Sequence, residues 1–175
     1  MGNDLGLIHI YCGDGKGKTS AAVGLAIRAA GFGYRVLFVQ FVKSGKSSEL
    51  NIMRGIDKIN VFDGYSVEKF TFNMSDEEKR ECLNGQNKLL KETERMSKEY
   101  DVVILDEIFG AISSGTLDRG LVLEFIKNKP QNLELVITGR EPEKEFVDLA
   151  DYVTELKKVK HPYDRGIGAR MGIEK

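Results

Sequence analysis

Three alternating glycines and a lysine–threonine pair stand where an apolar segment gives way to one with helical spacing. These residues are Gly13, Asp14, Gly15, Lys16, Gly17, Lys18, Thr19 and Ser20. Glycine lets backbone N–H groups turn toward an anion, and the start of the helix that follows adds free N–H groups and a positive dipole end. Lys18 contributes a point charge, and the Thr19 hydroxyl can ligate Mg²⁺. The segment therefore predicts a loop that binds the phosphates of a nucleotide.

The spacing of this loop departs by one residue from the pattern G-x-x-x-x-G-K-[ST]. Cys12 stands where the pattern has its first glycine, and Gly13 follows one position later. We expect a slightly shifted register for the phosphates, and for Cys12 the role of a small buried apolar residue. The alternative is a glycine-rich turn without a ligand. Three glycines and Lys-Thr between a strand and a helix make that the weaker interpretation.

A pair of carboxylates, Asp106 and Glu107, follows the apolar run at residues 101–105. An acidic group at the end of such a strand can hold Mg²⁺, directly or through water, and a neighbouring Glu can serve as the base in nucleotide hydrolysis. The pair is weak evidence alone, because carboxylates often end strands, but it becomes specific beside a phosphate-binding loop. Arg140, after the apolar run at residues 133–138, is a further candidate for phosphate binding, with a structural role as its alternative.

The elements that must position these residues alternate along the chain. Apolar runs at residues 7–12, 35–42, 59–62, 101–105, 133–138 and 152–156 predict strands, and helical spacing at residues 19–30, 76–99, 117–127 and 143–149 predicts helices. Gly31 and Gly33 are expected to end the first helix, and Ser75 with Glu78 forms a capping box at the start of the second. Residues 44–49 and 63–74 are expected to form loops.

This alternation predicts an α/β fold: a mostly parallel sheet with helices on both faces, in the P-loop NTPase (RecA-like) architecture. Ligands of such sheets bind at the C-terminal ends of the strands. Residues 13–19, 40–43, 106–107 and 139–140 should therefore lie along one edge. With no repeat or linker, residues 1–175 are expected to form a single nucleotide-binding domain, in which residues 157–175 are a basic C-terminal tail with a net charge of +4.

Composition excludes several classes of protein. The net charge of −1 over 175 residues does not indicate a nucleic-acid-binding protein. No run approaches the roughly 18 apolar residues of a membrane span, and no secretory signal is expected. Two cysteines and two distant histidines provide neither a disulfide framework nor a zinc site, so a cytoplasmic protein is expected. Nineteen glycines without a collagen period indicate glycine at particular backbone positions.

From residue 7 to residue 175 the chain resembles the P-loop corrinoid adenosyltransferases, which act on cob(I)alamin or cob(I)yrinic acid a,c-diamide. The resemblance is carried by YCGDGKGKTSAA, RVLFVQFVKSG, DVVILDE, LVITGR and DLADYVTELKKVKHPYDRGIGARMGIEK. The last stretch, with its LADxVTE, VKHP and ARxGIE pieces, distinguishes this family from other P-loop proteins. The one-residue departure of the loop is also typical of the family.

The resemblance implies an enzyme of cobalamin biosynthesis that transfers the 5′-deoxyadenosyl group of ATP to Co(I) of a corrinoid and releases triphosphate. Cobalt would be the nucleophile, so the protein needs no nucleophile or general base of its own. It further implies that residues 13–20 and Arg140 bind ATP, that Lys18, Thr19 and Glu107 are catalytic, and that Mg²⁺ is held by Thr19 and Glu107 with Asp106.

The resemblance also implies that Phe70 and Phe72 lie near the corrinoid and keep its lower axial ligand off cobalt; ordinary core packing is the alternative. A homodimer is typical of the family, and an electron-donor protein such as a flavoprotein would supply reduced cobalt. Nucleic-acid and membrane partners are not expected.

Two other functions stay open from the residues alone. One is a P-loop ATPase or small-molecule kinase, in which Glu107 aligns a water or a hydroxyl group. A kinase normally needs an arginine-rich lid, which the middle of the chain lacks. The other is a nucleotide-dependent carrier that delivers a corrinoid without catalysis, against which the intact set of Lys18, Thr19 and Glu107 argues.

Overall fold

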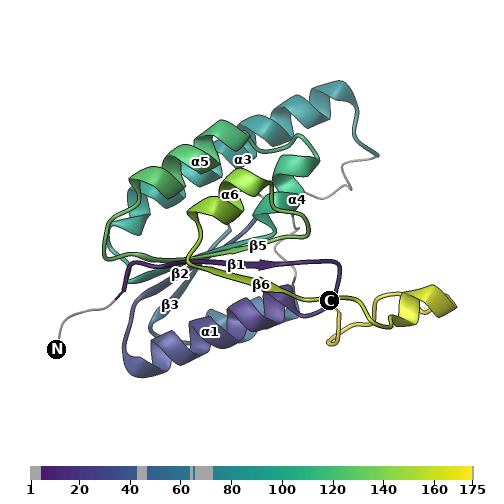
Figure 1. The fold of residues 1–175 in the computed structure, drawn as a ribbon, viewed down its shortest axis with the longest axis horizontal. Helices are drawn as coiled ribbons and strands as arrows, with labels where there is room; N and C mark the ends of the chain where they lie inside the picture. Colours follow the sequence, from purple (N-terminus) through teal and green to yellow (C-terminus); the bar gives the residue numbers. More distant parts are fainter. Residues whose placement is uncertain (1–4, 43–46, 64, 66–72, 175) are drawn as a thin grey trace.

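The computed structural model describes residues 5–42, 47–63, 65 and 73–174, and in these residues strands and helices alternate as expected (Figure 1). The elements are β1 (Ile8–Cys12), α1 (Lys18–Phe32), β2 (Val36–Gln40), α2 (Ser48–Met53), β3 (Ile59–Phe62), α3 (Asp76–Ser97), β4 (Val102–Asp106), α4 (Ile108–Ser113), α5 (Arg119–Asn128), β5 (Glu134–Thr138), α6 (Lys144–Leu149) and β6 (Tyr152–Glu155), followed by a 3₁₀ turn at Pro162–Arg165.

The strands of the described chain form one sheet of six strands in the order β3-β2-β4-β5-β1-β6. Every neighbouring pair in this sheet is parallel. The sequence predicted a mostly parallel sheet, and the observed one is wholly parallel because a crossover connection joins each strand to the next. All six carboxyl ends therefore face the same edge, which is called the carboxyl edge below.

Helices cover both faces of the sheet, as predicted (Figure 1). Side chains of α1 and α2 pack on one face, and those of α3, α4, α5 and α6 pack on the other. The strands supply both cores by alternation: in β2, Leu37 and Val39 join the larger core, whereas Val36 and Phe38 join the core under α1. Burial on both faces explains why the central strands β2 and β4 are continuous apolar runs in the sequence.

The ends of two helices carry the local signals that the sequence contains. Ser75 and Glu78 form the capping box at the start of α3, with the Glu78 N–H donating to Ser75 Oγ and the Ser75 N–H donating to the Glu78 carboxylate. Gly33 ends α1 in the left-handed conformation with φ of 112°. The expectation that Gly31 also ends this helix is wrong, because α1 continues through Phe32.

The sequence patterns did not predict two short helices, α2 and α4. The loop expected at residues 44–49 is in part wrong, because Ser48 and Glu49 belong to α2, whose Leu50 and Met53 are buried. The helix α4 begins directly after the carboxylate pair. Helices of six residues contain less than two turns, so their apolar spacing gives almost no periodic signal. No helix in the described part of the chain is long and apolar enough to cross a membrane.

Candidate functional site

The glycine-rich loop between β1 and α1 lies at the carboxyl edge and packs closely against the start of the tail. Gly13 and Gly17 have φ of 100° and 116°, a conformation that side-chain-bearing residues rarely adopt. A Cβ atom added to Gly15 would lie 2.5 Å from the carbonyl oxygen of Leu156. The N–H groups of Gly13 and Gly15 donate to the carbonyls of Arg140 (2.8 Å) and Leu156 (2.7 Å). Glycine is thus required here for conformation and for close approach.

Lys18 places its ammonium group inside this loop. Its Nζ donates to the carbonyl oxygens of Gly13, at 2.8 Å, and Gly15, at 2.7 Å. The residue is only 8% exposed. Burial lowers the pKa of Lys18, the carboxylate of Glu107 acts in the opposite direction, and Arg140 lowers the pKa further. The loop therefore holds a poorly solvated ammonium group by its own carbonyls, which a phosphate could replace as partners.

A row of polar side chains crosses the carboxyl edge on the face covered by α1. Gln40, Asp106 and Thr138 end the neighbouring strands β2, β4 and β5. Asp106 is fully buried and accepts hydrogen bonds from Gln40 Nε2 (3.2 Å) and Thr138 Oγ1 (2.8 Å). The Thr19 hydroxyl, at the start of α1, donates to both oxygens of the Asp106 carboxylate, at 2.9 and 3.2 Å. Thr19 and Asp106, which were both expected at this edge of the sheet, are thus in direct contact.

Glu107 adopts a strained backbone conformation at the end of β4. Its φ is 64°, a left-handed conformation that costs on the order of 1 kcal/mol for a residue other than glycine. Its N–H donates to Thr138 Oγ1 at 2.9 Å. Gly139 packs against Phe109, two residues after Glu107. A side chain at residue 139 would clash, because its Cβ would lie 2.5 Å from the Cβ of Phe109. Strained residues of this kind concentrate at functional sites, and this one turns the chain between β4 and α4.

The basic tail is docked on the outer side of the glycine-rich loop. The Lys158 N–H donates to the Asp14 carboxylate at 2.8 Å, and Lys16 Nζ donates to Glu174 at 3.2 Å. Glu174 is also bound by Arg170 at 2.9 Å. The hydrogen bond from Lys158 holds the pKa of Asp14 below its ordinary value. The side chains of Asp14 and Lys16 are therefore engaged with the tail.

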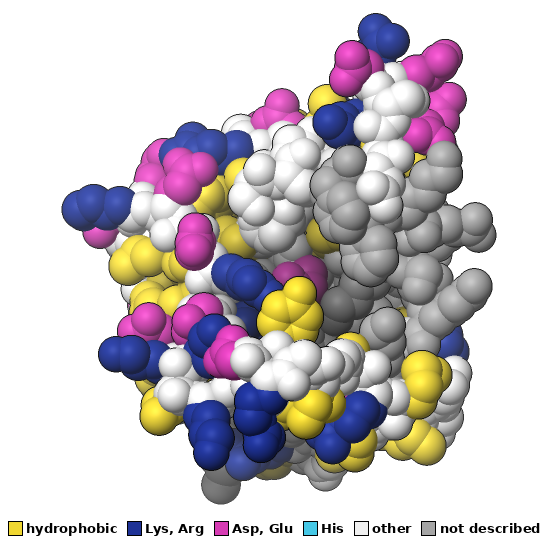
Figure 2. Space-filling model, turned by 90° about the vertical axis from the view of Figure 1, so that its right-hand side faces the viewer, with side chains coloured by type: hydrophobic (Ala, Val, Ile, Leu, Met, Phe, Trp, Pro, Cys, Tyr) yellow, Lys and Arg dark blue, Asp and Glu magenta, His cyan; other side chains and the backbone are white. Residues whose placement is uncertain are grey.

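Several predicted site residues stand apart from this cluster. The side chains of Ser20 and Arg140 are exposed, although Arg140 lies near enough to lower the pKa of Lys18. Phe70 and Phe72 lie outside the described residues. Figure 2 shows the carboxyl edge face-on: Lys and Arg side chains gather in its lower half, whereas Asp and Glu side chains gather at the top, where α3 begins with three acidic residues.

Residues 40–43 were expected only to lie along the carboxyl edge, and no role was predicted for Gln40 or Thr138, although both hold Asp106. A signal was present in the sequence, because each is a polar residue at the end of an apolar strand. The contact itself depends on β4 lying between β2 and β5, which is a property of the sheet order.

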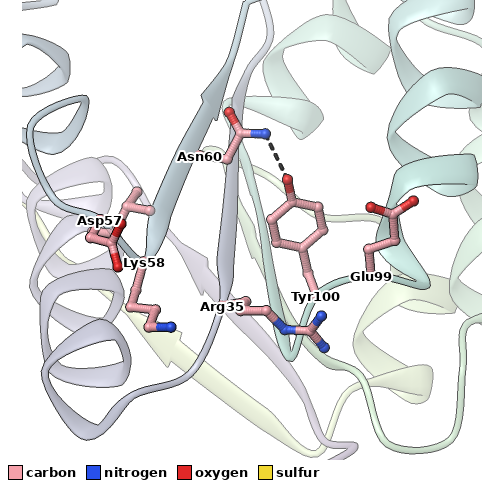
Figure 3. A pocket seen from close by; sticks show the side chains of 7 residues that line it. Arg35, Asp57, Lys58, Asn60, Glu99 and Tyr100 are labelled. Carbon is pink, nitrogen blue, oxygen red and sulfur yellow. Dashed lines mark hydrogen bonds between the residues drawn. The ribbon is translucent and has the colours of Figure 1, made fainter.

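A hollow of about 420 Å³ lies at the opposite edge of the sheet from the glycine-rich loop (Figure 3). It is lined by Arg35, Asp57, Lys58, Ile59, Asn60, Glu99 and Tyr100. Asn60 donates to the hydroxyl group of Tyr100 at 2.6 Å, and side chains of both charge signs surround them. The hollow lies at the amino ends of β2 and β3, and the glycine-rich loop lies at the carboxyl edge.

Comparison with known proteins agrees with this arrangement. Residues 4–174 match the model of the ATP:corrinoid adenosyltransferase BtuR/CobO/CobP family. The chain is 31% identical to the corrinoid adenosyltransferase of Escherichia coli K12, covering 98% of this chain and 87% of that one. It is 34% identical to corrinoid adenosyltransferase CobA of Salmonella typhimurium, with coverage of 97% and 85%.

Among solved structures, EssC (ATPases 2 and 3) from Geobacillus thermodenitrificans shares the fold, with a TM-score of 0.53 and 14% identity over 97% of this chain and 35% of that one. At this identity the likeness shows a shared α/β fold. The family match over nearly the whole chain, with the identity to the two corrinoid adenosyltransferases, establishes that this protein belongs to the ATP:corrinoid adenosyltransferase family, enzymes that transfer the adenosyl group of ATP to a corrinoid.

Proposed function

We propose that the glycine-rich loop and the first turn of α1 bind the triphosphate of ATP, and that Lys18 is the main cation on it. The observation that carries the proposal is the Lys18 ammonium group, held inside the loop at 2.7 and 2.8 Å from two carbonyl oxygens. Since the N–H groups of Gly13 and Gly15 already donate to protein carbonyls, we assign phosphate binding chiefly to N–H groups from Lys16 to Ser20. These include the first residues of α1, whose N–H groups have no partner within the helix.

In the reaction of this family, Co(I) of the reduced corrinoid attacks C5′ of ATP. A cobalt–carbon bond forms, the bond between C5′ and its oxygen breaks, and triphosphate leaves with the electron pair. Negative charge then increases on the triphosphate, beside the Lys18 ammonium and the positive end of α1. Positioning of ATP and stabilisation of this leaving group are the work we assign to the protein.

We further propose that Mg²⁺ is bound beside the triphosphate by Thr19, with Glu107 and Asp106 nearby. Oxygen donors of this kind suit Mg²⁺, which binds through few protein ligands together with substrate phosphates. The Thr19 hydroxyl donates its proton to Asp106, which suits its oxygen to act as a ligand to a metal ion. When bound, the ion would supply positive charge to the leaving triphosphate.

The remaining parts of the proposed function rest on family resemblance and on the tail. We propose that Phe70 and Phe72 lie beside the corrinoid, that a flavoprotein-like donor supplies electrons, and that residues 1–175 act as one cytoplasmic domain. We also propose a homodimer. Its support is the exposure of apolar tail side chains, among them Val159 at 92% and Met171 at 78%, which sedimentation analysis would test.

The product of the reaction tests the central proposal. With ATP, Mg²⁺ and a chemically reduced corrinoid, we expect adenosylcorrinoid and triphosphate in equal amounts. ADP and orthophosphate would indicate an ATPase instead, and tight corrinoid binding without product would indicate a carrier. For the aromatic residues, Phe72→Ala should impair a reaction that starts from intact cobalamin more than one that starts from free Co(I); an equal loss would point to destabilisation only.

A further inference from the structure

Gln40, at the end of β2, has a buried hydrogen-bond acceptor that the described protein does not satisfy. The residue is 5% exposed, and its Oε1 has no hydrogen-bond partner within the described part of the chain. Buried acceptors are almost always paired in folded proteins, and an unpaired one costs free energy. An exception at the carboxyl edge therefore points to a group that arrives with a ligand.

The orientation of the Gln40 amide is fixed by Asp106. The two residues are register partners on neighbouring strands, and Gln40 Nε2 donates to Asp106 Oδ2 at 3.2 Å. Turning the amide over would place Oε1 against the carboxylate oxygen, acceptor against acceptor. The amide nitrogen thus has to face Asp106, and the carbonyl oxygen is directed away from it.

Asp106 itself has little accepting capacity left. Oδ1 accepts from Thr19 and Thr138, and Oδ2 accepts from Thr19 and Gln40. A carboxylate offers about four acceptor sites, and three donors, with the Thr19 hydroxyl shared between both oxygens, occupy most of them. Asp106 is therefore suited to orient Thr19 and Gln40, and a donor arriving beside Thr19 needs a different acceptor.

We propose that Gln40 Oε1 accepts a hydrogen bond from a water molecule on the Mg²⁺ ion of the Mg·ATP complex. This rests on the proposed function, which places Mg²⁺ at Thr19. Mg²⁺ in proteins keeps several of its waters, and each has protons that must be accepted. Thr19 Oγ1 and Gln40 Nε2 both lie 3.2 Å from the same oxygen of Asp106. The Gln40 amide is therefore a neighbour of the Thr19 hydroxyl, to which the proposed function assigns Mg²⁺. Gln40 is a positioning residue in this role, because it acts through the water.

The test compares Gln40→Met, which removes both polar atoms, with Gln40→Glu, which keeps an acceptor but loses the donor to Asp106. Titration calorimetry gives the affinity for Mg²⁺ in the presence of ATP and the affinity for ATP without metal. Electron paramagnetic resonance of bound Mn²⁺, used in place of Mg²⁺, measures occupancy of the metal site without turnover. The matched control is Gln86→Met: Gln86 is fully buried on α3, and both of its polar atoms are unpaired in the described structure.

We expect Gln40→Met to weaken Mg²⁺ binding about tenfold, with metal-free ATP binding unchanged. Gln40→Glu should bind Mg²⁺ at least as tightly as the wild type, because it keeps the acceptor and adds negative charge. Gln86→Met should leave Mg²⁺ affinity unchanged. If Gln40→Met does not fold, Gln40→Asn, which withdraws the amide by one carbon, replaces it with the same expectation.

Three results overturn the inference. A larger loss in Gln40→Glu than in Gln40→Met would mean that the donor to Asp106 is the whole role of Gln40. An equal loss of ATP affinity in Gln40→Met with and without Mg²⁺ would mean that Gln40 Oε1 contacts the nucleotide itself or only supports the fold. If ATP binding by the wild type itself does not depend on Mg²⁺, the metal assignment of the proposed function fails, and the inference fails with it.

Discussion

Replacing Gly15 by alanine tests the close contact between the glycine-rich loop and the tail. The new Cβ would lie 2.5 Å from the Leu156 carbonyl oxygen, 2.8 Å from its carbonyl carbon and 2.9 Å from the carbonyl carbon of Lys157, whereas ordinary contact begins at 3.4 Å. All three neighbours are backbone atoms, so no flexible side chain can yield. The loop and the tail must separate by most of an ångström, which also stretches the 2.7 Å hydrogen bond from Gly15 to Leu156.

The size of the effect follows from these contacts. Overpacking costs about 1–3 kcal/mol and a weakened hydrogen bond about 1 kcal/mol. Alanine offsets about 0.4–1 kcal/mol by restricting the unfolded chain. We expect a net loss of about 2 kcal/mol, which lowers the Tm of a protein of this size by about 4–8 °C. Displacement of the loop should also weaken ATP binding by about tenfold or more.

Thermal unfolding and titration calorimetry with ATP measure the two effects. Gly31→Ala is the matched control, since Gly31 lies within α1 and a Cβ there meets nothing within 4 Å. It should raise stability by about 0.5–1 kcal/mol and leave ATP affinity unchanged. Wild-type stability and ATP affinity in Gly15→Ala would refute the rigid contact between loop and tail.

Three further predictions concern the loop, the tail and the thiols. Lys18→Ala should weaken ATP binding by about tenfold to over a hundredfold, because a charge-assisted contact is worth roughly 1.5–3 kcal/mol; near-normal affinity in calorimetry would show that other groups hold the phosphates. Asp14 has a pKa below its ordinary value of 3.8, so its bond to the Lys158 amide should persist above that pH and be lost as the pH falls through the lowered pKa. The chemical shift of the Lys158 amide, followed by NMR as the pH is lowered, should show this transition, and the transition should be absent in Asp14→Ala. Burial raises the pKa of Cys12 and Cys82, so neither thiol should react with a thiol reagent at neutral pH until the protein unfolds, when both should.

Much of the fold could be predicted from local patterns. Apolar runs identified all six described strands within a few residues. For the central strands β2, β4 and β5 the physical reason is burial on both faces, which requires an apolar residue at nearly every position. The edge strand β6 is exposed along its whole length, so burial does not explain its apolar residues. The capping box at Ser75 identified the start of α3 because the hydrogen bonds it forms are local. The short helices α2 and α4 gave no such signal. Their apolar residues are defined by the surfaces that they cover, and those surfaces belong to other segments.

The candidate site likewise combines local features, which the sequence contains, with contacts that form only in the folded chain. The candidate residues could be named from the sequence: the glycines of the loop, Lys18, Thr19 and the carboxylate pair after β4, together with the family that these pieces identify. These features are local, since each depends on residue types at fixed spacing beside a strand or a helix. The family match also carries substrate and reaction, which no spacing alone supplies.

The contacts among these groups depend on the folded chain. Gln40 and Thr138 hold Asp106 because the sheet order sets β4 between β2 and β5, although 66 and 32 residues separate them from it along the chain. The tail reaches the loop through a hydrogen bond that spans 144 residues. Contacts of this kind depend on strand order and close packing, which are collective properties of the folded chain. The unpaired oxygen of Gln40 became visible only once these neighbours were in place.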